Sequence, residues 1–592
     1  MAVPERDEID EEDKWNVSKL YTEDELEQEK NNIKEMLQDI KDRSDTFTDS
    51  GDNLLEMLDL YSEMMRKVSK LSRYASHRSD EDTRKQEFQA LKAEVQGLSA
   101  QISSQTAFID PEIQKLDEEE LEKMIESTDG LEKYSHYLDE ILRMKEHTRS
   151  EEVENVLGQL SDVLDASSES YSMLTNADIE FPSVEKDGEE VQITQANFGK
   201  LLKKNDRSFR KKVFEGFYDT FDDYTNTIGT TFSKNVRSNV KMSGIRGYGS
   251  ARERALDSSN IPVKVYDNLV ETVEDNLDAL HGHVELKKEA LDVEELNMWD
   301  VYMPITEDEE PEISFEEAKD YIIEALQPLG DKYVERVEEA FDKRWIDIYE
   351  NKGKRSGAYS GGAYDTPPYI LMNYQDDVSS MYTLAHEMGH SMHSYFTNEN
   401  QPYVYSNYDI FVAEVASTVN EALLTRYLME NAENERIKRH ALNHSLENFR
   451  NTLFRQTLFA DFEHRAHREI EEGGTITHER ATEIYGNLKE KWYEPAEIDD
   501  RIRQEWMRIP HFYYNFYVYQ YSTGMSAAMT LSQKILSEGP EDYLEFLKTG
   551  SSKYPLEALK VAGVDMSSPE PVEQAIDIYR ERIEDAEDLV GN

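Results

Sequence analysis

Apolar residues recur at three- and four-residue steps over a long N-terminal stretch, and this spacing constrains the fold more than any other feature of the chain. From Asn31 to about Asp178, apolar positions such as Leu54 and Leu58 alternate with charged ones at helical period. Pro111 is the one proline in this stretch, and we expect it to mark a loop before the next helix. The pattern predicts a helical lobe.

Two irregular stretches interrupt the helical pattern. Residues 181–193 place Asp187 and Gly188 between two short strand-like runs, which predicts a β-hairpin. Residues 351–374 combine a Gly-rich loop with a strand-like run, and long helical patterns follow to the C-terminus. We therefore expect a mostly α fold, with a small β-hairpin or sheet next to the helix that comes after residue 374.

The chain is strongly acidic. It has 124 Asp and Glu against 66 Lys and Arg among 592 residues, which gives a net charge of −58. Nucleic acids and anionic membranes bind cationic surfaces, so we expect neither as a partner. With 34 Tyr, 21 Phe and 5 Trp, the chain is too aromatic for a disordered acidic tail. Because salt screens the repulsion between carboxylates, we expect a halophilic protein from a high-salt cytoplasm. An ordinary acidic protein is the alternative, because Lys is not scarce in the sequence.

The absence of cysteine excludes disulfides and thiolate metal sites, so any metal must be bound by His, Asp or Glu. The acidic N-terminal segment lacks the positively charged and apolar regions of a secretory signal. The sequence also has no run of about 18 apolar residues, the length that a membrane span needs. These features predict a cytoplasmic protein.

His386, Glu387 and His390 form the motif H-E-x-x-H within a segment of helical pattern. Residues four apart share a helix face about 6 Å apart, so both imidazoles can reach one ion, and Glu387, about 100° round, can reach a ligand of that ion. This geometry suits one zinc ion, with Glu387 as the general base for a metal-activated water. Chance predicts only about 0.07 such motifs in a chain of this composition.

A catalytic zinc needs a third protein ligand besides the two histidines. The segment FVAEVASTVNEALL offers Glu414 and Glu421 on nearly the same helix face, so that one can bind the ion and the other can hold a ligand imidazole. Asp409 competes with them. Glu414 is favoured by its apolar, small-residue surroundings, where an unpaired charge is costly. We interpret His393, a turn beyond the motif, as a packed and hydrogen-bonded neighbour.

A tyrosine-rich segment, PHFYYNFYVYQYSTG, lies near the C-terminus. If it is helical, four hydrogen-bond donors fall within an arc of about 120°, whereas Tyr513 lies just off that arc and Tyr519 points away. These four donors are His511, Tyr514, Tyr517 and Tyr521. Such a face can stabilise the oxyanion that forms when water attacks a peptide carbonyl. Core packing is the alternative, although every buried hydroxyl would then need a partner.

The loop from Ser356 to Gly362 lacks the Lys-Ser/Thr ending of a phosphate-binding loop. We expect it to be a flexible flap that contacts a peptide. The strand-like run from Tyr369 to Tyr374 is expected to offer an edge on which a peptide backbone can pair. The alternative is a plain surface loop followed by a structural hairpin.

Four motifs in this order carry a resemblance to a known family. They are GAYSGGAYDTPPYILMNY, HEMGHSMH, FVAEVASTVNEALL and PHFYYNFYVYQYSTG. Together they resemble the oligoendopeptidase F branch of the thimet-oligopeptidase-like (M3) family of zinc metallopeptidases. The resemblance extends from about Asn16 to near Glu584.

The resemblance implies roles for residues that match the family's motifs. The third zinc ligand of the family is the Glu of an E-x-x-S motif, which corresponds to Glu414 and Ser417 rather than to Asp409. Ala416 stands where relatives outside this branch carry Pro. A His and a Tyr of the last motif stabilise the oxyanion in the family, which points to His511 with Tyr514 or Tyr521, and then Tyr517.

The resemblance also implies an architecture. We expect a mostly helical ellipsoid of two lobes, with zinc at the floor of a deep channel. Three parts are expected: an N-terminal helical lobe over residues 1–112, an oligopeptidase F N-terminal-type domain with the hairpin over residues 113–200, and an M3-like catalytic domain over residues 201–592.

The sequence thus predicts a zinc-dependent endopeptidase that hydrolyses internal bonds of short oligopeptides, as a monomer or weak homo-oligomer with one zinc per chain. A zinc carboxypeptidase on a similar scaffold is one alternative, and it would need a group that binds the terminal carboxylate of the substrate. A non-catalytic peptide-binding protein with a structural metal is the other.

Overall fold

The computed structural model describes residues 3–306 and 310–590, and its fold is mostly helical with two small sheets. About 70% of the chain is helix, which confirms the predicted fold class. None of the helices in the described residues combines the length and apolar character of a membrane span.

The chain divides into two compact units, each assembled from three separate segments. The first unit comprises Met1–Glu146, Glu310–Asn431 and Leu531–Gly563. The second unit comprises His147–Glu309, Ala432–Thr530 and Val564–Asn592. The candidate metal ligands lie in the first unit, and the tyrosine-rich segment lies in the second.

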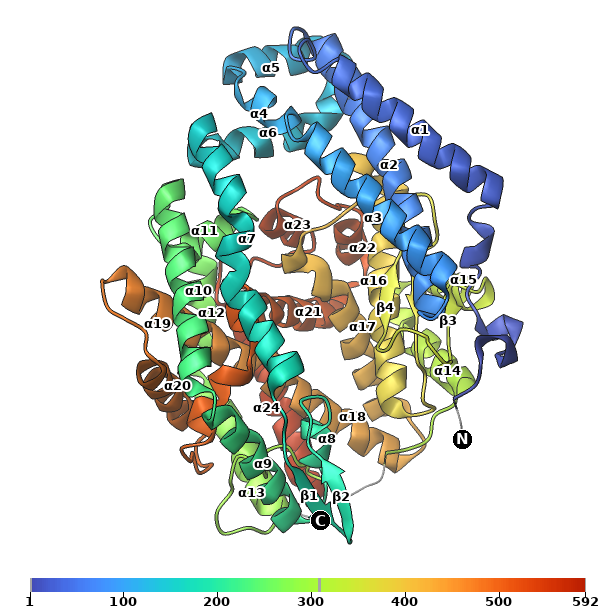
Figure 1. The fold of residues 1–592 in the computed structure, drawn as a ribbon. Coiled ribbons are helices and arrows are strands. Elements are labelled where there is room, and N and C mark those ends of the chain that lie inside the picture. The colour runs from blue at the N-terminus through green and yellow to red at the C-terminus, as the bar shows by residue number, and fades with distance from the viewer. Residues whose placement is uncertain (1–2, 307–309, 591–592) are drawn as a thin grey trace. The chain divides into compact units, whose positions relative to one another are not determined.

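The first unit is built from helices around one three-stranded sheet (Figure 1). Its elements are α1 (Glu23–Asp42), α2 (Gly51–Glu81), α3 (Gln86–Thr106), α4 (Ile109–Gln114), α5 (Glu118–Ser127), α6 (Ser135–Arg143), α14 (Phe315–Ala325), α15 (Asp331–Asp342), β3 (Ile346–Asp347), β4 (Tyr359–Gly361), β5 (Tyr369–Leu371), α16 (Val378–Asn400), α17 (Ile410–Asn431), α22 (Glu541–Leu547) and α23 (Pro555–Val561). The helix α21 (Tyr519–Glu538) is assigned to the second unit as far as Thr530 and to the first unit from Leu531.

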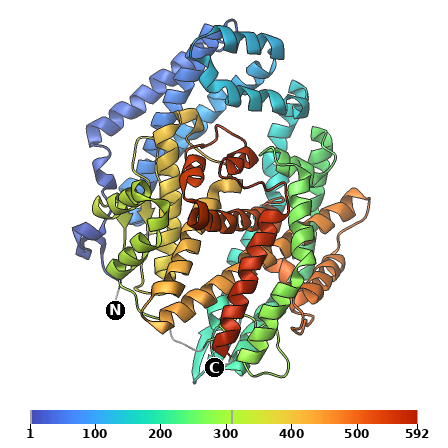
Figure 2. The same cartoon turned by 180° about the vertical axis from the view of Figure 1, so that it is seen from behind.

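The second unit is helical apart from one hairpin. Its elements are α7 (Glu151–Met173), β1 (Ser183–Lys186), β2 (Glu189–Gln192), α8 (Phe198–Leu201), α9 (Arg207–Asp222), α10 (Thr225–Arg246), α11 (Ala251–Asp257), α12 (Val263–Asp275), α13 (Leu277–Ala290), α18 (Glu435–Asn448), α19 (Arg455–Glu471), α20 (His478–Trp492) and α24 (Glu570–Val590). Figure 2 shows the C-terminal α24, in red, beside the green α12 and α13, and these helices pack together.

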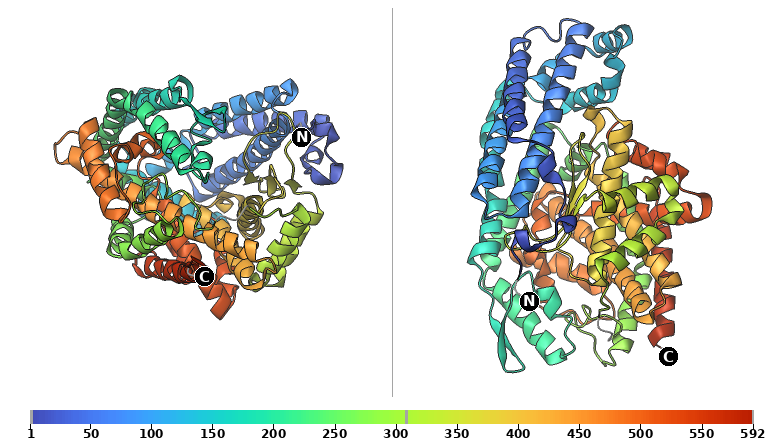
Figure 3. Two further views of the ribbon diagram at one scale, coloured as in Figure 1. Left: turned by 90° about the horizontal axis from the view of Figure 1, so that it is seen from below. Right: turned by 90° about the vertical axis from the view of Figure 1, so that its right-hand side faces the viewer.

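The predicted N-terminal helices are present as α1, α2 and α3, which lie side by side (Figure 3). Leu54, Leu58 and Leu71 are buried in their shared core, as the periodicity predicts. The prediction for Pro111 was wrong, because this residue lies inside α4 rather than in a loop. A proline is tolerated in the first turn of a helix, where its missing N–H has no intrahelical partner to lose.

The predicted hairpin is confirmed. β1 and β2 pair antiparallel, with Lys186 opposite Glu189. The two residues between them, Asp187 and Gly188, have φ values of +54° and +86°. A two-residue hairpin turn requires this left-handed backbone, and the Asp-Gly pair supplies it at low cost.

The sheet of the first unit has the strand order β3-β5-β4. β5 pairs in parallel with β3 and antiparallel with β4, with Ser360 opposite Ile370. The prediction that the run from Tyr369 supplies a free edge was therefore wrong, since β5 is the central strand and is paired on both sides. β4 lies within the loop expected to be a flap, and it is one of the two edge strands of the sheet.

α16 and α17, yellow and amber in Figure 1, form the most extensive helix pair among the described residues. Gly389 in α16 makes their close approach possible. A Cβ atom at this position would lie 2.5 Å from Ser417 Cα and 2.6 Å from the Ala416 carbonyl oxygen, both on α17. Because these are backbone atoms, no side-chain rotation could relieve the clash.

We expect Gly389→Ala to lower the free energy of unfolding by about 2 kcal/mol, although Ala favours helix by about 1 kcal/mol, because the two helices must move apart. Gly97→Ala in α3 is the matched control, since its new methyl group would meet no atom within 4 Å. It should leave stability unchanged or raise it by up to about 1 kcal/mol. Urea denaturation followed by circular dichroism measures both, and a Gly389→Ala variant as stable as wild type would contradict the close approach.

Candidate active site

The structure brings the imidazoles of His386 and His390 together with the carboxylate of Glu414. The two histidines come from adjacent turns of α16, and the glutamate comes from the neighbouring helix α17. The Nε2 atoms of the histidines are 3.2 Å apart. Glu414 Oε2 lies 3.4 Å from His386 Nε2 and 3.6 Å from His390 Nε2.

These three distances fit a single metal ion. Zinc binds nitrogen and oxygen ligands at about 2.0 to 2.1 Å, so the ligand atoms of a tetrahedral site stand about 3.3 Å apart. The observed separations of 3.2, 3.4 and 3.6 Å bracket that value. Two imidazoles and one carboxylate are also the donor types of a catalytic zinc site. The residues present therefore fit zinc.

Glu421, one of the two carboxylates expected near the metal, is not one of the three grouped ligands but contacts one of them, His386. Its Oε1 lies 2.6 Å from His386 Nδ1. In the neutral ring this contact makes Nδ1 the protonated nitrogen of His386, so that Nε2, which faces Glu414, carries the lone pair. The His390 ring is held in a similar way by a hydrogen bond to the backbone of Ala413.

The two imidazoles have opposite pKa shifts in the absence of an ion. Burial opposes protonation of His386, but its hydrogen bond to Glu421 and the charges of Glu421 and Glu414 outweigh burial and raise its pKa to about 9. Burial, together with the charge on His386, lowers the pKa of His390 to about 3. Without an ion, the surrounding carboxylates therefore favour a positive charge on His386, and the charged His386 disfavours one on His390.

Glu387 lies against this cluster and is only 8% exposed. Burial raises the pKa of its carboxyl group, while the charge on His386 and a backbone hydrogen bond from Ser360 act in the opposite direction. Ser360 belongs to the edge strand β4, and its Oγ lies 2.8 Å from the Oγ of Ser391 on α16. The edge strand and the motif helix are thus joined beside Glu387.

Two other candidates from the sequence lie outside the ligand cluster. Asp409 precedes α17, and its Oδ1 accepts a hydrogen bond from the N–H of Phe411 at 2.8 Å. His393 is fully buried and stacks on Tyr408, with ring centroids 3.7 Å apart. The prediction of a packed His393 is confirmed, but the predicted hydrogen bond was wrong, because neither ring nitrogen has a partner within the described part of the chain.

The tyrosine-rich segment of the second unit does not form the single helix on which its predicted face was based. Residues 510–513 form a short 3-10 helix, and α21 begins only at Tyr519. Between them Asn515 and Phe516 have φ values of +48° and +58°. The prediction of a continuous helix was therefore wrong.

The grouping of side chains predicted for that segment is nevertheless present. The ring of His511 contacts those of three tyrosines, with centroids 5.6 to 6.2 Å apart. These tyrosines are Tyr514, Tyr517 and Tyr521. Tyr513 and Tyr519 lie elsewhere, as expected: Tyr513 contacts the Thr231 hydroxyl at 2.7 Å, and the ring of Tyr519 packs on Tyr266.

Glu463 supports this turn and was not found by sequence reasoning. It is fully buried in α19, and its Oε1 accepts a hydrogen bond from the Phe516 N–H at 2.7 Å. Burial raises the pKa of its carboxyl group to about 8. No motif surrounds Glu463, and in so acidic a chain a single glutamate gives no sequence signal.

Comparison with known proteins identifies the family. Residues 200–578 match Peptidase family M3, and residues 112–181 match the family described as Oligopeptidase F. Oligopeptidase PepF of Bacillus subtilis (strain 168) is 48% identical over 485 residues, which cover 81% of this chain and 72% of that protein. Group B oligopeptidase PepB of Streptococcus agalactiae serotype III (strain NEM316) is 42% identical over 81% of both chains.

Solved structures agree with this assignment. The crystal structure of a putative peptidase from Chlamydophila abortus has a TM-score of 0.90 at 33% identity, covering 99% of this chain and 100% of that one. Oligoendopeptidase-F from Enterococcus faecium has a TM-score of 0.74 at 35% identity, covering 96% and 99%. The chain therefore belongs to peptidase family M3, as a metallo-endopeptidase of the oligoendopeptidase F type.

Proposed function

We propose that this peptidase hydrolyses internal bonds of short oligopeptides with one zinc ion held by His386, His390 and Glu414. The single observation that carries the proposal is the set of three ligand atoms 3.2 to 3.6 Å apart beside the buried Glu387. When bound, zinc would polarise the scissile carbonyl and acidify the attacking water.

Glu387 acts as the general base in this proposal. Its carboxylate accepts a proton from the attacking water and then delivers that proton to the nitrogen of the leaving amine. Glu421 holds the Nδ1–H of His386, so that the Nε2 lone pair stays directed at the metal position.

His511 and the tyrosines around it stabilise the oxyanion of the tetrahedral intermediate in this proposal. A neutral imidazole and a phenol both donate hydrogen bonds without adding a net charge, and burial, followed by the charge on Arg455, lowers the pKa of His511. Of the three tyrosines, Tyr514 is 55% exposed and so is accessible to a substrate.

We expect His511→Ala and Tyr514→Phe each to lower kcat by about 10²- to 10³-fold, because each removes one donor that acts in the transition state. Tyr521→Phe and Tyr517→Phe test in the same assay whether these hydroxyls, in that order of preference, supply the donor instead of Tyr514. Tyr513→Phe is the matched control, because its hydroxyl contacts Thr231 outside the cluster. Steady-state kinetics on one peptide measures all five variants, and wild-type kcat in every cluster variant would refute the role.

Digestion of peptides of graded length, blocked at both ends, tests the proposed function, with casein as a protein-sized control and mass spectrometry of the products. We expect cleavage at internal bonds of short peptides and intact casein. Release of residues only from free C-termini would support a carboxypeptidase instead. Absence of any cleavage by the zinc-loaded protein would refute the peptidase function.

The predictions about the cellular setting belong to the same proposal. We propose a cytoplasmic enzyme, monomeric or weakly associated, that works in high salt. With a net charge of −58, the carboxylates of the folded chain repel one another unless salt screens them. The unfolding midpoint should therefore rise between dilute buffer and multimolar salt, and an unchanged midpoint would contradict the halophilic character.

A further inference from the structure

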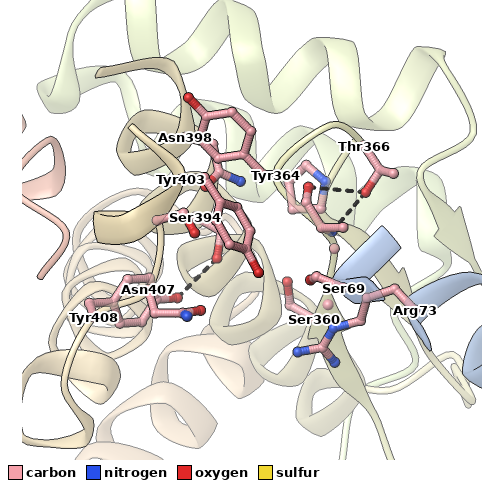
Figure 4. Close-up of a pocket in the computed structure, with 15 residues that line it drawn as sticks. Ser69, Arg73, Ser360, Tyr364, Thr366, Ser394, Asn398, Tyr403, Asn407 and Tyr408 are labelled. Carbon is pink, nitrogen blue, oxygen red and sulfur yellow. Dashed lines mark hydrogen bonds between the residues drawn. The ribbon is translucent and has the colours of Figure 1, made fainter. Parts of the chain in front are cut away.

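A cavity of about 240 Å³ lies beside the edge strand β4 in the first unit. Its walls come from α2, from β4 and the loop after it, from the end of α16 and from residues 403–408 (Figure 4). Ser360, in one wall, is also the residue whose backbone bonds to Glu387. The cavity and the proposed general base are thus connected through one residue of β4.

The lining of this cavity has an unusual charge for this chain. Of the fifteen described residues that line it, only Arg73 carries a charge, and none is Asp or Glu. Acidic residues make up 124 of the 592 positions, so about three would be expected among fifteen by chance. The remaining polar groups are hydroxyls and amides. The lining of the cavity therefore carries a net positive charge, although the protein as a whole is strongly acidic.

Arg73 lacks the partner that surface arginines of an acidic chain usually have. Within residues 3–306 and 310–590 its guanidinium makes no hydrogen bond or ion pair, and the residue is exposed. Figure 4 shows it reaching from α2 towards Ser360, and a Cβ on Gly361 would lie 3.4 Å from Arg73 Nη1. The nearest acidic residue in sequence to the lining loop, Asp365, is already bound by Arg66 at 2.7 Å.

The cavity also offers an unused hydrogen-bonding group. Asn398 Oδ1 is buried and has no partner within the described part of the chain. A buried amide oxygen without a partner costs free energy that a bound N–H can recover. Arg73 and Asn398 together therefore provide a cation and an amide, which suit the carboxylate and the backbone of a peptide.

We propose that this cavity is a substrate subsite in which Arg73 binds a carboxylate of the peptide, an inference that rests on the proposed function. Ser360 lines the cavity and its backbone bonds to Glu387, so a peptide residue held in the cavity would lie close in sequence to the bond that Glu387 serves. The volume, about 240 Å³, is below that of a pocket for a drug-sized ligand and suits a single amino-acid residue.

Matched peptides test the subsite. One set carries Glu or Gln at each of the two positions on either side of the scissile bond, with both ends blocked. A second set differs only in a free or amidated C-terminus. We measure kcat/KM for wild type, Arg73→Gln, Arg73→Lys and the control Lys70→Gln, which removes the same charge from the same helix outside the cavity. All assays use one ionic strength, since salt screens charge.

We expect wild type to favour the anionic member of one pair by about tenfold or more, as one charge-assisted hydrogen bond allows. Arg73→Gln should abolish this preference, while Arg73→Lys retains part of it and Lys70→Gln retains all of it. If wild type prefers Glu over Gln peptides, the carboxylate that Arg73 binds is a side chain. If it prefers the free over the amidated C-terminus, that carboxylate is the terminal one.

An equal preference in wild type and Arg73→Gln would overturn the subsite. Cleavage of the neutral peptides would then still stand as evidence for the proposed peptidase function, so the two failures are distinguishable. Circular dichroism confirms that Arg73→Gln is folded. If Arg73→Gln does not fold, Arg73→Lys decides the outcome, because a lysine cannot bind a carboxylate bidentately. A full wild-type preference in both Arg73→Lys and Lys70→Gln would then count against a specific arginine contact.

Discussion

Replacing Glu387 by Gln will lower kcat by about 10²- to 10⁴-fold, with little change in KM. The amide has the same shape as the carboxylate but cannot accept a proton from water at neutral pH. Glu387 is 8% exposed and lies outside the His386, His390 and Glu414 cluster, so its replacement removes a proton acceptor and keeps the three proposed ligands. Steady-state kinetics on a blocked peptide, at one zinc per chain, measures the effect.

The control for this prediction lies on the same helix. Glu399 is exposed near the end of α16, where it accepts a hydrogen bond from Tyr395 at 2.8 Å. Glu399→Gln makes the same chemical change, and we expect its kcat to stay within about twofold of wild type, as for most surface changes. Hydrolysis by Glu387→Gln at the wild-type rate, with zinc content unchanged, would refute the assigned mechanism.

Local geometry explains why so much of the candidate site could be predicted. His386 and His390 face the same way because four residues make about one helical turn, and this holds wherever the helix lies. Gly389 in the middle of a helix signals a close neighbour, and the backbone of α17 is that neighbour. Glu414 was favoured because a charge among small apolar residues needs a partner. The grouping follows from these rules, while the zinc ligation itself stays a prediction.

The shape of the tyrosine-rich segment could not be predicted, because contacts from distant residues determine it. Its helical spacing groups the side chains whose rings contact His511, yet the chain turns at Asn515 and Phe516 instead of continuing as a helix. Glu463 stabilises this turn from a position 53 residues earlier. A hydrogen bond between residues so far apart leaves no periodic pattern in the sequence.

Strand pairing was missed for a related reason. Tyr369 to Leu371 were correctly predicted as a strand from their composition. Whether a strand is central or at an edge depends on its partners, and β3 begins 23 residues before β5. β4, one of the two edge strands of this sheet, carries Ser360 and borders the Arg73 cavity.

Replacing Glu414 by Gln will remove bound zinc and with it peptide hydrolysis. The change keeps the size of the side chain but exchanges a charged oxygen ligand for a neutral amide, which leaves the two imidazoles to hold the ion alone. Loss of a residue that only hydrogen-bonds a metal ligand lowers zinc affinity by roughly 10- to 100-fold. We expect Glu414→Gln to lower zinc affinity by more than this, and kcat at limiting zinc to fall in proportion to the zinc lost. Zinc per chain, measured by mass spectrometry after dialysis against a chelator, reports the loss.

Glu421→Gln on the same helix separates a ligand from a residue that orients one. Glu421 lies 2.6 Å from His386 Nδ1 and on the side of the ring away from the cluster. Its replacement should therefore weaken zinc binding by about 10- to 100-fold, and excess zinc should restore most of the activity. Excess zinc should not restore Glu414→Gln to the same extent. If both variants bind one zinc with wild-type affinity, neither carboxylate serves the metal, and the ion must be held by other groups.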